Sequence, residues 1–435
     1  MKKRFAGICL LVLCLVGCQY GKERQEIFTD ITEDKPSTVS SNLLVKAPVD
    51  REYAKEEIPV LEKVIDESVT TTSAATTEET RAREEIGMSD ATIRTFISSQ
   101  IGNYYFDSLS KDDRVLYAEI YMILVNNAKD IVVSSKDTNQ IDFVFQCVLA
   151  DHPEIFHVQG YAYTKHTIND ELNRITFTGT YLYSTEEVAS RKVQMEQYVN
   201  TCINGIPTGS SSYEKVKYIY EYLIAHTNYN LEAPDNQNIC SVFIYGESVC
   251  QGYAKATQYL LNRLGVTTTL VTGYVINSGE GHAWNLVNID KAYYYVDTTW
   301  GDAFYTLEDS NGTNVSGSTP TINYDYLCVT TNQLCKTHVI DNLITMPYCN
   351  LMDANYYVRE GCYFTWADEE KIKQLFSNAY AKGQPYVTLK CESDEVYRGL
   401  EKLLITDTKI FSYLQNSNSV SYTSSLEQLS FSFWL

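Results

Sequence analysis

Three residues of this chain could together activate a thiol: Cys250, His282 and Asp297. A nucleophilic cysteine needs a base that takes its proton, and the base needs an acid that orients it. Each residue alone has an ordinary alternative, as a core cysteine, a structural histidine or a turn-capping aspartate. Together they predict a site for acyl transfer, because they occur in order within Ser248-Val-Cys-Gln-Gly-Tyr-Ala254, Gly281-His-Ala-Trp-Asn285 and Tyr295-Val-Asp-Thr-Thr-Trp300.

The elements around these residues could bring them together. Residues 251–264 have the apolar spacing of an amphipathic helix, and residues 267–276, 283–289 and 293–299 read as strands. The two-residue turn between the last two strands predicts an antiparallel hairpin that places His282 near Asp297. A helix packed on this sheet would bring Cys250 to His282, and its N-terminal N–H groups would stabilise a thiolate there.

The sequence around the triad resembles the transglutaminase-like superfamily, relatives of papain-type cysteine proteases, and is most similar to its bacterial secreted members. The resemblance covers residues 211–302 and implies that Cys250 is the nucleophile, His282 the base and acid, and Asp297 the residue that orients it. The runs that carry it are Val249-Cys-Gln-Gly-Tyr-Ala254, Leu260-Leu-Asn-Arg-Leu-Gly265, Gly281-His-Ala-Trp-Asn285 and Val296-Asp-Thr-Thr-Trp300.

The resemblance also implies an oxyanion site made by the Cys250 backbone N–H and a side chain upstream of it. Gln237, Asn238 and Tyr245 are the candidates for this second donor, with Gln237 ranked first. Trp284 is a further candidate for a substrate contact, although packing in the core is the alternative for an aromatic residue at this position.

The N-terminus has the pattern of a secretory signal peptide. Lys2, Lys3 and Arg4 precede an apolar stretch, residues 5–16, that is too short for a comfortable membrane span. Leu15-Val-Gly-Cys18 resembles a bacterial lipobox, which implies cleavage before Cys18 and lipidation of its sulfur. We therefore expect a protein anchored by lipid to the membrane at the bacterial cell surface. An ordinary signal peptide with an incidental cysteine is the alternative.

The charge of the chain limits its partners. The formal net charge is −20 at pH 7, and removal of the signal peptide would make it three charges more negative. An acidic chain of this kind is a poor candidate for binding nucleic acid, which selects for basic patches. Neutral or basic substrates fit better, and we expect a protein or peptide substrate, with cell-wall peptide among the candidates.

The cysteine pattern predicts neither a metal site nor a cofactor. No pair of cysteines has the CxxC spacing, with histidines at suitable distances, that a zinc site requires. Export would permit disulfides, but most of the remaining cysteines lie in apolar runs where buried free thiols are equally compatible. Besides the signal peptide, Cys18 and Cys250, eight cysteines remain: Cys147, Cys202, Cys240, Cys328, Cys335, Cys349, Cys362 and Cys391.

Composition divides the chain into five segments. We expect a signal peptide (1–17), a lipidated, disordered stalk rich in acidic residues and threonine (18–85) and an N-terminal α/β domain (86–205). A catalytic domain (206–345) and a small C-terminal α/β domain (346–435) follow. The predicted fold class is α+β, with a papain-like or transglutaminase-like core in which a helix packs on an antiparallel sheet.

Three functions are compatible with these residues. The first is a surface-anchored peptidase or amidase that forms a thioester acyl-enzyme and passes it to water. The second is a transglutaminase that passes the acyl group to an amine and cross-links envelope proteins. The third is an inactive module that binds cell wall or protein. We favour hydrolysis because water is always present.

Overall fold

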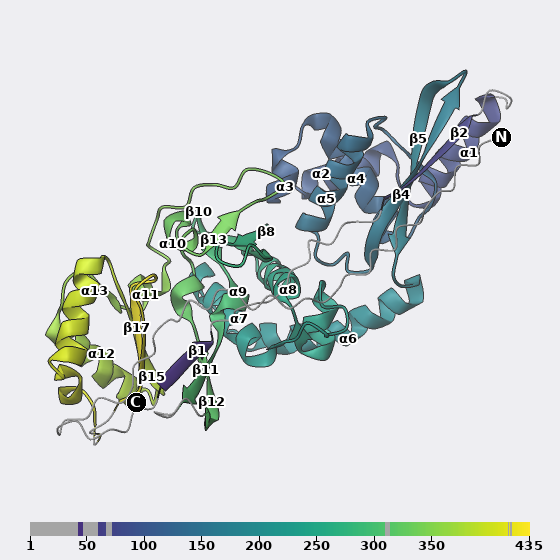
Figure 1. Cartoon of the computed structure of the whole chain (residues 1–435). Coiled ribbons are helices and arrows are strands. Elements are labelled where there is room, and N and C mark those ends of the chain that lie inside the picture. The colour runs from purple at the N-terminus through teal and green to yellow at the C-terminus, as the bar shows by residue number, and fades with distance from the viewer. Residues whose placement is uncertain (1–41, 47–59, 67–71, 309–313, 416, 418–419) are drawn as a thin grey trace, which may run out of the picture.

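The computed structural model describes residues 42–46, 60–66, 72–308, 314–415, 417 and 420–435 (Figure 1). The predicted signal peptide and Cys18 lie outside these residues. Among the residues described, no helix has the length and apolar character needed to cross a membrane.

The N-terminal unit packs helices against one four-stranded sheet. Strand order is β2-β4-β5-β3, with β2 parallel to β4 and the other neighbours antiparallel. Its buried apolar residues, from Met88 to Phe177, form a core of their own. The elements are β2 (Val60–Asp66), α1 (Thr72–Glu85), α2 (Asp90–Ser99), α3 (Tyr104–Ser108), α4 (Lys111–Val125), β3 (Ile131–Val133), α5 (Thr138–Asp151), β4 (Val158–Ile168) and β5 (Glu171–Tyr181).

Part of the segment predicted to be a disordered stalk is folded. Helix α1 lies within residues 18–85, and its Arg83 donates hydrogen bonds to the carbonyl of Val132 at 2.6 Å and to Glu119 at 2.8 Å. Glu119 is buried, so this ion pair fixes the end of α1 to the N-terminal core. The composition of the segment did not predict that α1 is folded, because an ion pair with a distant residue does not change the low hydrophobicity of the segment. Strands β1 (Asn42–Lys46) and β2 also fall in this segment.

The middle unit is built on a four-stranded antiparallel sheet of order β10-β9-β8-β13. A second sheet, β1-β11-β12, joins β1 from the N-terminal segment to two strands of the middle unit, and β6 and β7 form a parallel pair. The elements are α6 (Thr185–Asn204), α7 (Ser212–His226), β6 (Asn228–Tyr229), η1 (Ser241–Tyr245), β7 (Glu247–Ser248), α8 (Cys250–Arg263), β8 (Thr268–Val275), β9 (Gly281–Ile289), β10 (Ala292–Val296), α9 (Thr298–Gly301), β11 (Asp302–Glu308), β12 (Asn314–Ile322), η2 (Tyr324–Tyr326), α10 (Thr331–Leu334) and β13 (His338–Ile340).

Helix α8 packs on this sheet, as the sequence predicted. Its apolar face is buried, with Ala256, Leu260 and Leu261 among the residues that lose all contact with water. Between helix and sheet, the buried side chain of Asn285 on β9 donates a hydrogen bond to the carbonyl of Ala254 at 3.0 Å. The expected α+β class, with a helix on an antiparallel sheet, is therefore confirmed.

The C-terminal unit is a four-stranded mixed sheet of order β14-β15-β17-β16 with helices beside it. In Figure 1 it lies at one end of the molecule and the N-terminal unit at the other, with α8 between them. The elements are α11 (Tyr356–Arg359), β14 (Tyr363–Phe364), α12 (Glu369–Ala381), β15 (Tyr386–Cys391), α13 (Asp394–Glu401), η3 (Lys402–Thr406), η4 (Lys409–Ser412), β16 (Tyr422–Ser425) and β17 (Ser430–Trp434).

The cores divide the chain differently from the boundaries expected at residues 205/206 and 345/346. One continuous cluster of buried apolar residues runs from Phe156 to Phe433 and joins α6, α8 and the C-terminal sheet. At the junction, Tyr324 and Tyr356 stack with ring centroids 3.6 Å apart. The segment that carries Cys250, His282 and Asp297 and the C-terminal unit therefore share a core.

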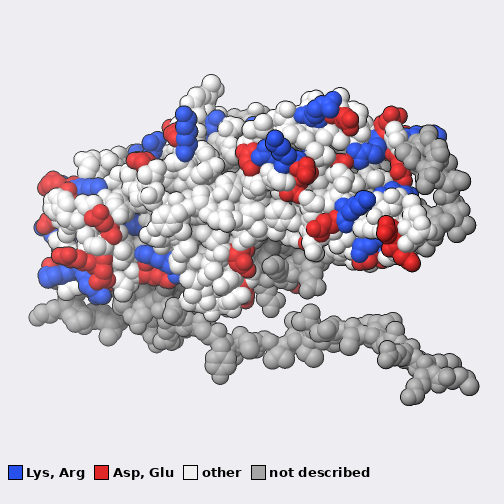
Figure 2. All heavy atoms as spheres, turned by 90° about the horizontal axis from the view of Figure 1, so that it is seen from above, with Lys and Arg blue, Asp and Glu red and all other residues white. Residues whose placement is uncertain are grey.

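Charged side chains are unevenly placed on the surface. On the face drawn in Figure 2, acidic and basic residues gather in mixed groups towards the two ends of the molecule. The stretch between these groups is mostly uncharged on this face.

Candidate active site

A tight hairpin places the histidine beside the aspartate. Strands β9 and β10 pair from Ala292↔Ile289 to Val296↔Asn285, and the two turn residues, Asp290 and Lys291, both have positive φ. Such a turn matches the twist of antiparallel strands and fixes their register. His282 Nε2 lies 2.7 Å from Asp297 Oδ2 as a result.

Asp297 is held by four hydrogen bonds. It caps the N-terminus of α9, so its Oδ1 accepts from the backbone N–H groups of Thr299 at 2.9 Å and Trp300 at 3.1 Å. Its Oδ2 accepts from His282 and from a second histidine, His338, at 3.1 Å. Burial disfavours the charge of Asp297, but the attraction of His282 and the hydrogen bonds from both histidines hold its pKa well below the usual range.

Cys250 lies beside His282 and contributes to the pKa of that histidine. Burial would lower the pKa of His282, but the charge of Asp297 and the hydrogen bonds to Asp297 and Cys250 outweigh it and raise this pKa to about 10. Because His282 Nε2 is bonded to the carboxylate, Nδ1 is the nitrogen left to exchange a proton with the thiol. All three residues are buried, with exposed fractions of 0% for Cys250, 2% for His282 and 0% for Asp297.

The first turn of α8 is shaped around the thiol. Cys250 is its first residue, and no side chain caps the helix at Val249. Gly252 is required by close approach: a Cβ there would overlap the hydroxyls of Ser248 and Ser241. These two hydroxyls bond each other at 2.6 Å, so they join η1 to β7, the strand that leads into α8.

Sequence reasoning missed His338. It lies on β13, which pairs with β8 and not with the strand that carries His282. Its ring is completely buried, and Trp284, Trp300 and Tyr326 lie around it with centroids 4.8 to 5.6 Å away. No local motif marks this residue. The run His-Val-Ile of a short strand is the one signal that could have found it, through the pairing of that strand with the catalytic sheet.

Among the described residues, one cluster has enough ligand atoms for a metal ion: His282, Asp297 and His338, with those atoms within 4.8 Å of one another. Both imidazole nitrogens approach the same carboxylate oxygen at 2.7 and 3.1 Å, which are hydrogen-bond distances. The second carboxylate oxygen already accepts two backbone bonds. The donor set therefore suits an array of hydrogen bonds around Asp297 better than coordination of a cation.

The four candidates for an oxyanion or substrate contact have different surroundings in the structure. Asn238 accepts a hydrogen bond from the backbone of Cys240 at 2.8 Å, and the hydroxyl of Tyr245 contacts Arg191 at 3.4 Å, so both side chains are engaged locally. Trp284 is fully buried on β9, with its ring stacked 5.8 Å from that of His282. It therefore packs against His282 and has no surface for a substrate.

Gln237 keeps its place as a candidate oxyanion donor. Its backbone carbonyl accepts from Lys255 of α8 at 3.1 Å, which ties this residue to the catalytic helix. Its side-chain Oε1 is buried and makes no hydrogen bond within the described structure. The neighbouring carbonyl of Asn236 accepts from Ser248 at 3.1 Å, so this loop runs beside the start of α8.

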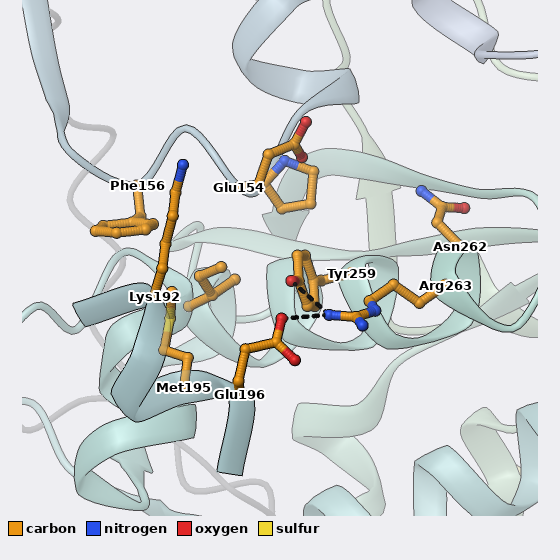
Figure 3. A pocket seen from close by; sticks show the side chains of 10 residues that line it. Glu154, Phe156, Lys192, Met195, Glu196, Tyr259, Asn262 and Arg263 are labelled. Carbon is orange, nitrogen blue, oxygen red and sulfur yellow. Dashed lines mark hydrogen bonds and ion pairs between the residues drawn. The ribbon is translucent and has the colours of Figure 1, made fainter. Parts of the chain in front are cut away.

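A separate hollow of about 460 Å³ lies at the other end of α8 (Figure 3). Phe156, Met195 and Tyr259 line it, and the ion pair of Arg263 with Glu196 stands at its side. Arg263 follows Cys250 by about 20 Å along the axis of α8, from the rise of 1.5 Å per residue. The hollow is therefore distinct from the catalytic triad.

None of the described cysteines forms a disulfide. Of nine free thiols, Cys335 is exposed and the others are buried. Burial raises the pKa of the structural thiols, for example to about 12 in Cys202 and Cys362 and to about 11 in Cys349. These side chains therefore behave as small core residues.

Comparison with known proteins identifies the central segment. Residues 200–298 match the model of the transglutaminase-like superfamily, which confirms the resemblance drawn from the four runs of sequence. Kyphoscoliosis peptidase from mouse (Mus musculus) is 24% identical over 148 residues, which make up 30% of this chain and 22% of that protein.

Two solved structures are similar over parts of the chain. The crystal structure of a TGase is 16% identical with a TM-score of 0.24, and the match covers 32% of this chain and 50% of that one. A protein from Cytophaga hutchinsonii, proposed to be a cysteine protease, is 13% identical with a TM-score of 0.23, covering 40% of this chain and 85% of its own. This chain thus spans about a fifth of the mouse protein and half of the TGase.

Proposed function

With the transglutaminase-like segment 200–298 as the premise, we propose that this chain is a thiol enzyme that hydrolyses carboxamide or peptide bonds. The observation that supports this most strongly is the buried cluster in which Cys250 lies beside His282 and His282 bonds Asp297 at 2.7 Å. A buried histidine with a raised pKa next to a thiol is the arrangement that a nucleophilic cysteine needs.

In the first half-reaction, the sulfur of Cys250, whose proton is held by His282, attacks the carbonyl carbon of the substrate. A carbon–sulfur bond forms, and the carbonyl oxygen takes the negative charge. When the oxyanion collapses, the carbon–nitrogen bond breaks and His282 gives its proton to the departing amine. A thioester on Cys250 and a free amine are the products of this half.

In the second half-reaction, His282 takes a proton from water, and the hydroxide attacks the thioester. The carbon–sulfur bond breaks, the carboxylic acid leaves, and the thiolate–imidazolium pair is restored. Asp297 remains ionised throughout, because its hydrogen bonds favour the charged form. Its role is to keep the imidazole in one orientation and to stabilise the imidazolium.

The oxyanion has two proposed donors. One is the backbone N–H of Cys250, which no side chain caps and which lies at the positive end of the α8 dipole. The other is the side-chain amide of Gln237, on the loop beside the start of α8. If so, Gln237→Ala should lower kcat by about 100- to 1,000-fold, as the loss of one such donor does elsewhere. Asn238→Ala and Tyr245→Phe are the comparison variants.

The direct test combines turnover with chemical trapping. Wild-type protein and Cys250→Ala are incubated with a library of peptides and with cell-surface protein, and new termini are identified by mass spectrometry. Hydroxylamine added during turnover should convert the thioester into hydroxamate only in the wild type. In parallel, iodoacetamide should alkylate Cys250 faster than the seven other buried thiols, with Cys335→Ser removing the exposed competitor.

The same experiment separates the alternatives. Incorporation of a primary amine into acceptor glutamine, in place of hydrolysis, would assign the chain as a transglutaminase acting on envelope proteins. Binding of cell-wall peptide or protein without turnover, thioester or selective alkylation would overturn the enzymatic proposal and assign a binding module.

We also propose that this chemistry takes place at the bacterial cell surface. The support is the sequence alone: a basic start, a short apolar stretch and the lipobox-like run that ends at Cys18. A peptide substrate, including cell-wall peptide, is compatible with the acidic chain.

A further inference from the structure

Asp297 is shared by two histidines, and the proposed reaction uses only one of them. His338 Nε2 lies 3.1 Å from Asp297 Oδ2, the same oxygen that His282 contacts, and the two imidazole centroids are 5.2 Å apart. His338 has no contact with Cys250 through which it could take part in proton transfer to the thiol in the array described above. A buried titratable group so close to the triad therefore needs a role of its own.

The hydrogen bonds of His338 define its protonation. A carboxylate oxygen can only accept, so the nitrogen facing Asp297, Nε2, carries a proton. Nδ1 lies 2.7 Å from the hydroxyl of Thr337. This hydroxyl can donate to Nδ1 or, over a longer distance of 3.4 Å, to the carbonyl of Leu334, and the shorter contact favours Nδ1. Burial and the nearby charge of His282 lower the pKa of His338, despite the opposing pull of Asp297. The ring is thus the neutral Nε2–H tautomer, with Thr337 as the donor that selects it.

We propose that His338 is a positioning residue that anchors the Asp297 carboxylate and, through it, keeps His282 aligned with Cys250. This inference deepens the proposed function and rests on it. Without His338, Oδ2 would keep only the bond to His282, which must move protons during the reaction. With it, the carboxylate has a second fixed donor on β13, so the catalytic aspartate is bound to α9, β9 and β13 at once.

The surroundings of His338 favour this role over simple packing. Its ring is enclosed by Trp284, Trp300 and Tyr326, so the imidazole has no room to turn away from Asp297. The hydroxyl of Thr337 is in turn 3.3 Å from that of Tyr326. The other titratable groups that face Asp297 and its two histidines from the packed elements are Cys250 on α8, Tyr220 on α7 and Tyr326 on η2.

The central test compares two substitutions at position 338. His338→Gln keeps a neutral N–H donor at similar reach, whereas His338→Phe keeps a ring but removes the donor. We expect His338→Phe to lower kcat by about 10- to 100-fold with little change in KM, which is the size expected for losing a hydrogen bond to a charged group. His338→Gln should recover most of this loss.

The pH profile provides a readout that packing alone would not move. Asp297 loses one of the donors that favour its ionised form in His338→Phe, so its protonation begins at a higher pH. On acidification, the His282–Asp297 hydrogen bond should therefore be lost at a pH about one unit higher in His338→Phe than in the wild type, and at the wild-type pH in His338→Gln. Equal losses of kcat in the two variants, or loss of the His282–Asp297 bond at the wild-type pH in His338→Phe, would overturn the proposal.

Thr337 offers a second variant if His338→Phe does not fold. Thr337→Val is nearly isosteric and removes the hydroxyl that selects the tautomer, so it should produce a smaller loss of kcat in the same direction. Thr337→Ser, which keeps the hydroxyl, is the matched control. Equal kcat in Thr337→Val and Thr337→Ser would count against the proposed tautomer and hence against the anchor.

An NMR measurement separates this inference from the proposed function. The downfield Nε2–H signal of His282 reports its bond to Asp297 whether or not any substrate turns over. On acidification this signal should vanish at a higher pH in His338→Phe than in the wild type and His338→Gln. Absence of turnover and of Cys250 alkylation in the wild type would reject the enzyme alone, while an identical His282 signal in all three proteins would reject the role of His338.

Discussion

At the scale of residues, the site depends on one carboxylate that is buried, ionised and fully hydrogen-bonded. Asp297 would be costly to bury alone, because an unpaired charge in a protein interior is strongly disfavoured. Its two backbone donors and two imidazoles offset this cost and leave the carboxylate one orientation. The raised pKa of His282 is the counterpart of this arrangement.

The triad should act as one unit. Cys250→Ala and His282→Ala should each reduce kcat by at least about 10,000-fold, and Asp297→Ala by about 1,000-fold, as in other triads. The double variant Cys250→Ala/His282→Ala should be no worse than Cys250→Ala. His226→Ala is the control, since His226 is exposed and bonded to the carbonyl of Tyr222. A double variant much slower than both single variants would show that the groups act independently.

Stability should fall as the pH rises through the alkaline range. The folded-state pKa of His282 is about 10, above its ordinary value of 6.5, so its protonated form stabilises the fold. That contribution is complete below about pH 6.5 and is lost as the pH rises towards 10. Urea unfolding of the wild type should show a slope of up to about 1.4 kcal/mol per pH unit in this window. His282→Gln should lack it, whereas the exposed-site control His226→Gln should keep it.

At the scale of elements, the site depends on how closely the start of α8 approaches the strand before it. Gly252 and Gly399 both lie inside helices, but they differ in their surroundings. A Cβ at Gly252 would overlap Ser248 and Ser241, whereas a Cβ at Gly399 in α13 would meet only Ala367, at 3.9 Å. At position 252, the lack of space therefore requires glycine. At position 399, no neighbouring atom excludes a larger residue.

The two glycines give a matched pair of substitutions. Gly252→Ala should lower the free energy of unfolding by about 1–3 kcal/mol through overpacking, in spite of the higher helix propensity of alanine. Because it displaces the turn that carries Cys250, it should also lower kcat. Gly399→Ala should be neutral or stabilise by up to about 1 kcal/mol. Thermal and urea unfolding measure both, and equal effects would show that the crowding at Gly252 is relieved by rotation of the serines.

The sequence predicted those elements whose signals are local. Helix α8 has an apolar stripe, and the β9–β10 hairpin has a two-residue turn with two strands of β-rich composition, so both were found with errors of a few residues at their ends. His338 could not be found in this way, because β13 is three residues long and reaches the site only by pairing with β8. The folded part of the predicted stalk was missed for a related reason, since Arg83 meets its partners far along the chain.

At the scale of the whole molecule, the C-terminal unit supports the segment that carries the site. Lys390 on β15 and Asp325 on η2 form an ion pair at 2.7 Å, and both are almost completely buried. Asp325 also accepts from Ser430 on β17 at 2.7 Å. The neighbouring residue, Tyr326, packs against the ring of His338. The backbone carbonyl of Tyr326 accepts a hydrogen bond from the backbone N–H of Asp297 at 3.0 Å. A polar connection therefore joins the C-terminal sheet to the catalytic aspartate.

Breaking this connection should be costly. Lys390→Met leaves the carboxylate of Asp325 buried without its cation and should lower the free energy of unfolding by about 3–5 kcal/mol. The control is Lys402→Met, which removes the exposed ion pair with Asp407 and should cost at most about 1 kcal/mol. Urea unfolding measures both variants. A cost for Lys390→Met no larger than that of the control would mean that the pair does not hold the units together.

Attachment to the membrane belongs to the same scale. If Cys18 carries the lipid anchor, Cys18→Ser should release the protein from the membrane fraction or block its processing. Cell fractionation and mass spectrometry of the N-terminal peptide measure this, with Cys335→Ser as a cysteine control outside the anchor. Wild-type protein found free of lipid in the medium would exclude the anchor.

The complete burial of the Cys250 side chain governs how fast any reagent can meet it. A carbonyl carbon has to come within about 3.5 Å of the sulfur, which the enclosed site does not allow without local opening. The observed rate is then the intrinsic reactivity multiplied by the fraction of molecules that are open at a given moment. Of two reagents with equal intrinsic reactivity, the larger should therefore alkylate Cys250 more slowly. The rate of a bulky maleimide relative to that of iodoacetamide should be lower at Cys250 than at the exposed Cys335. A bound substrate that keeps the site open would also cover the sulfur, so occupancy and accessibility have to be measured separately.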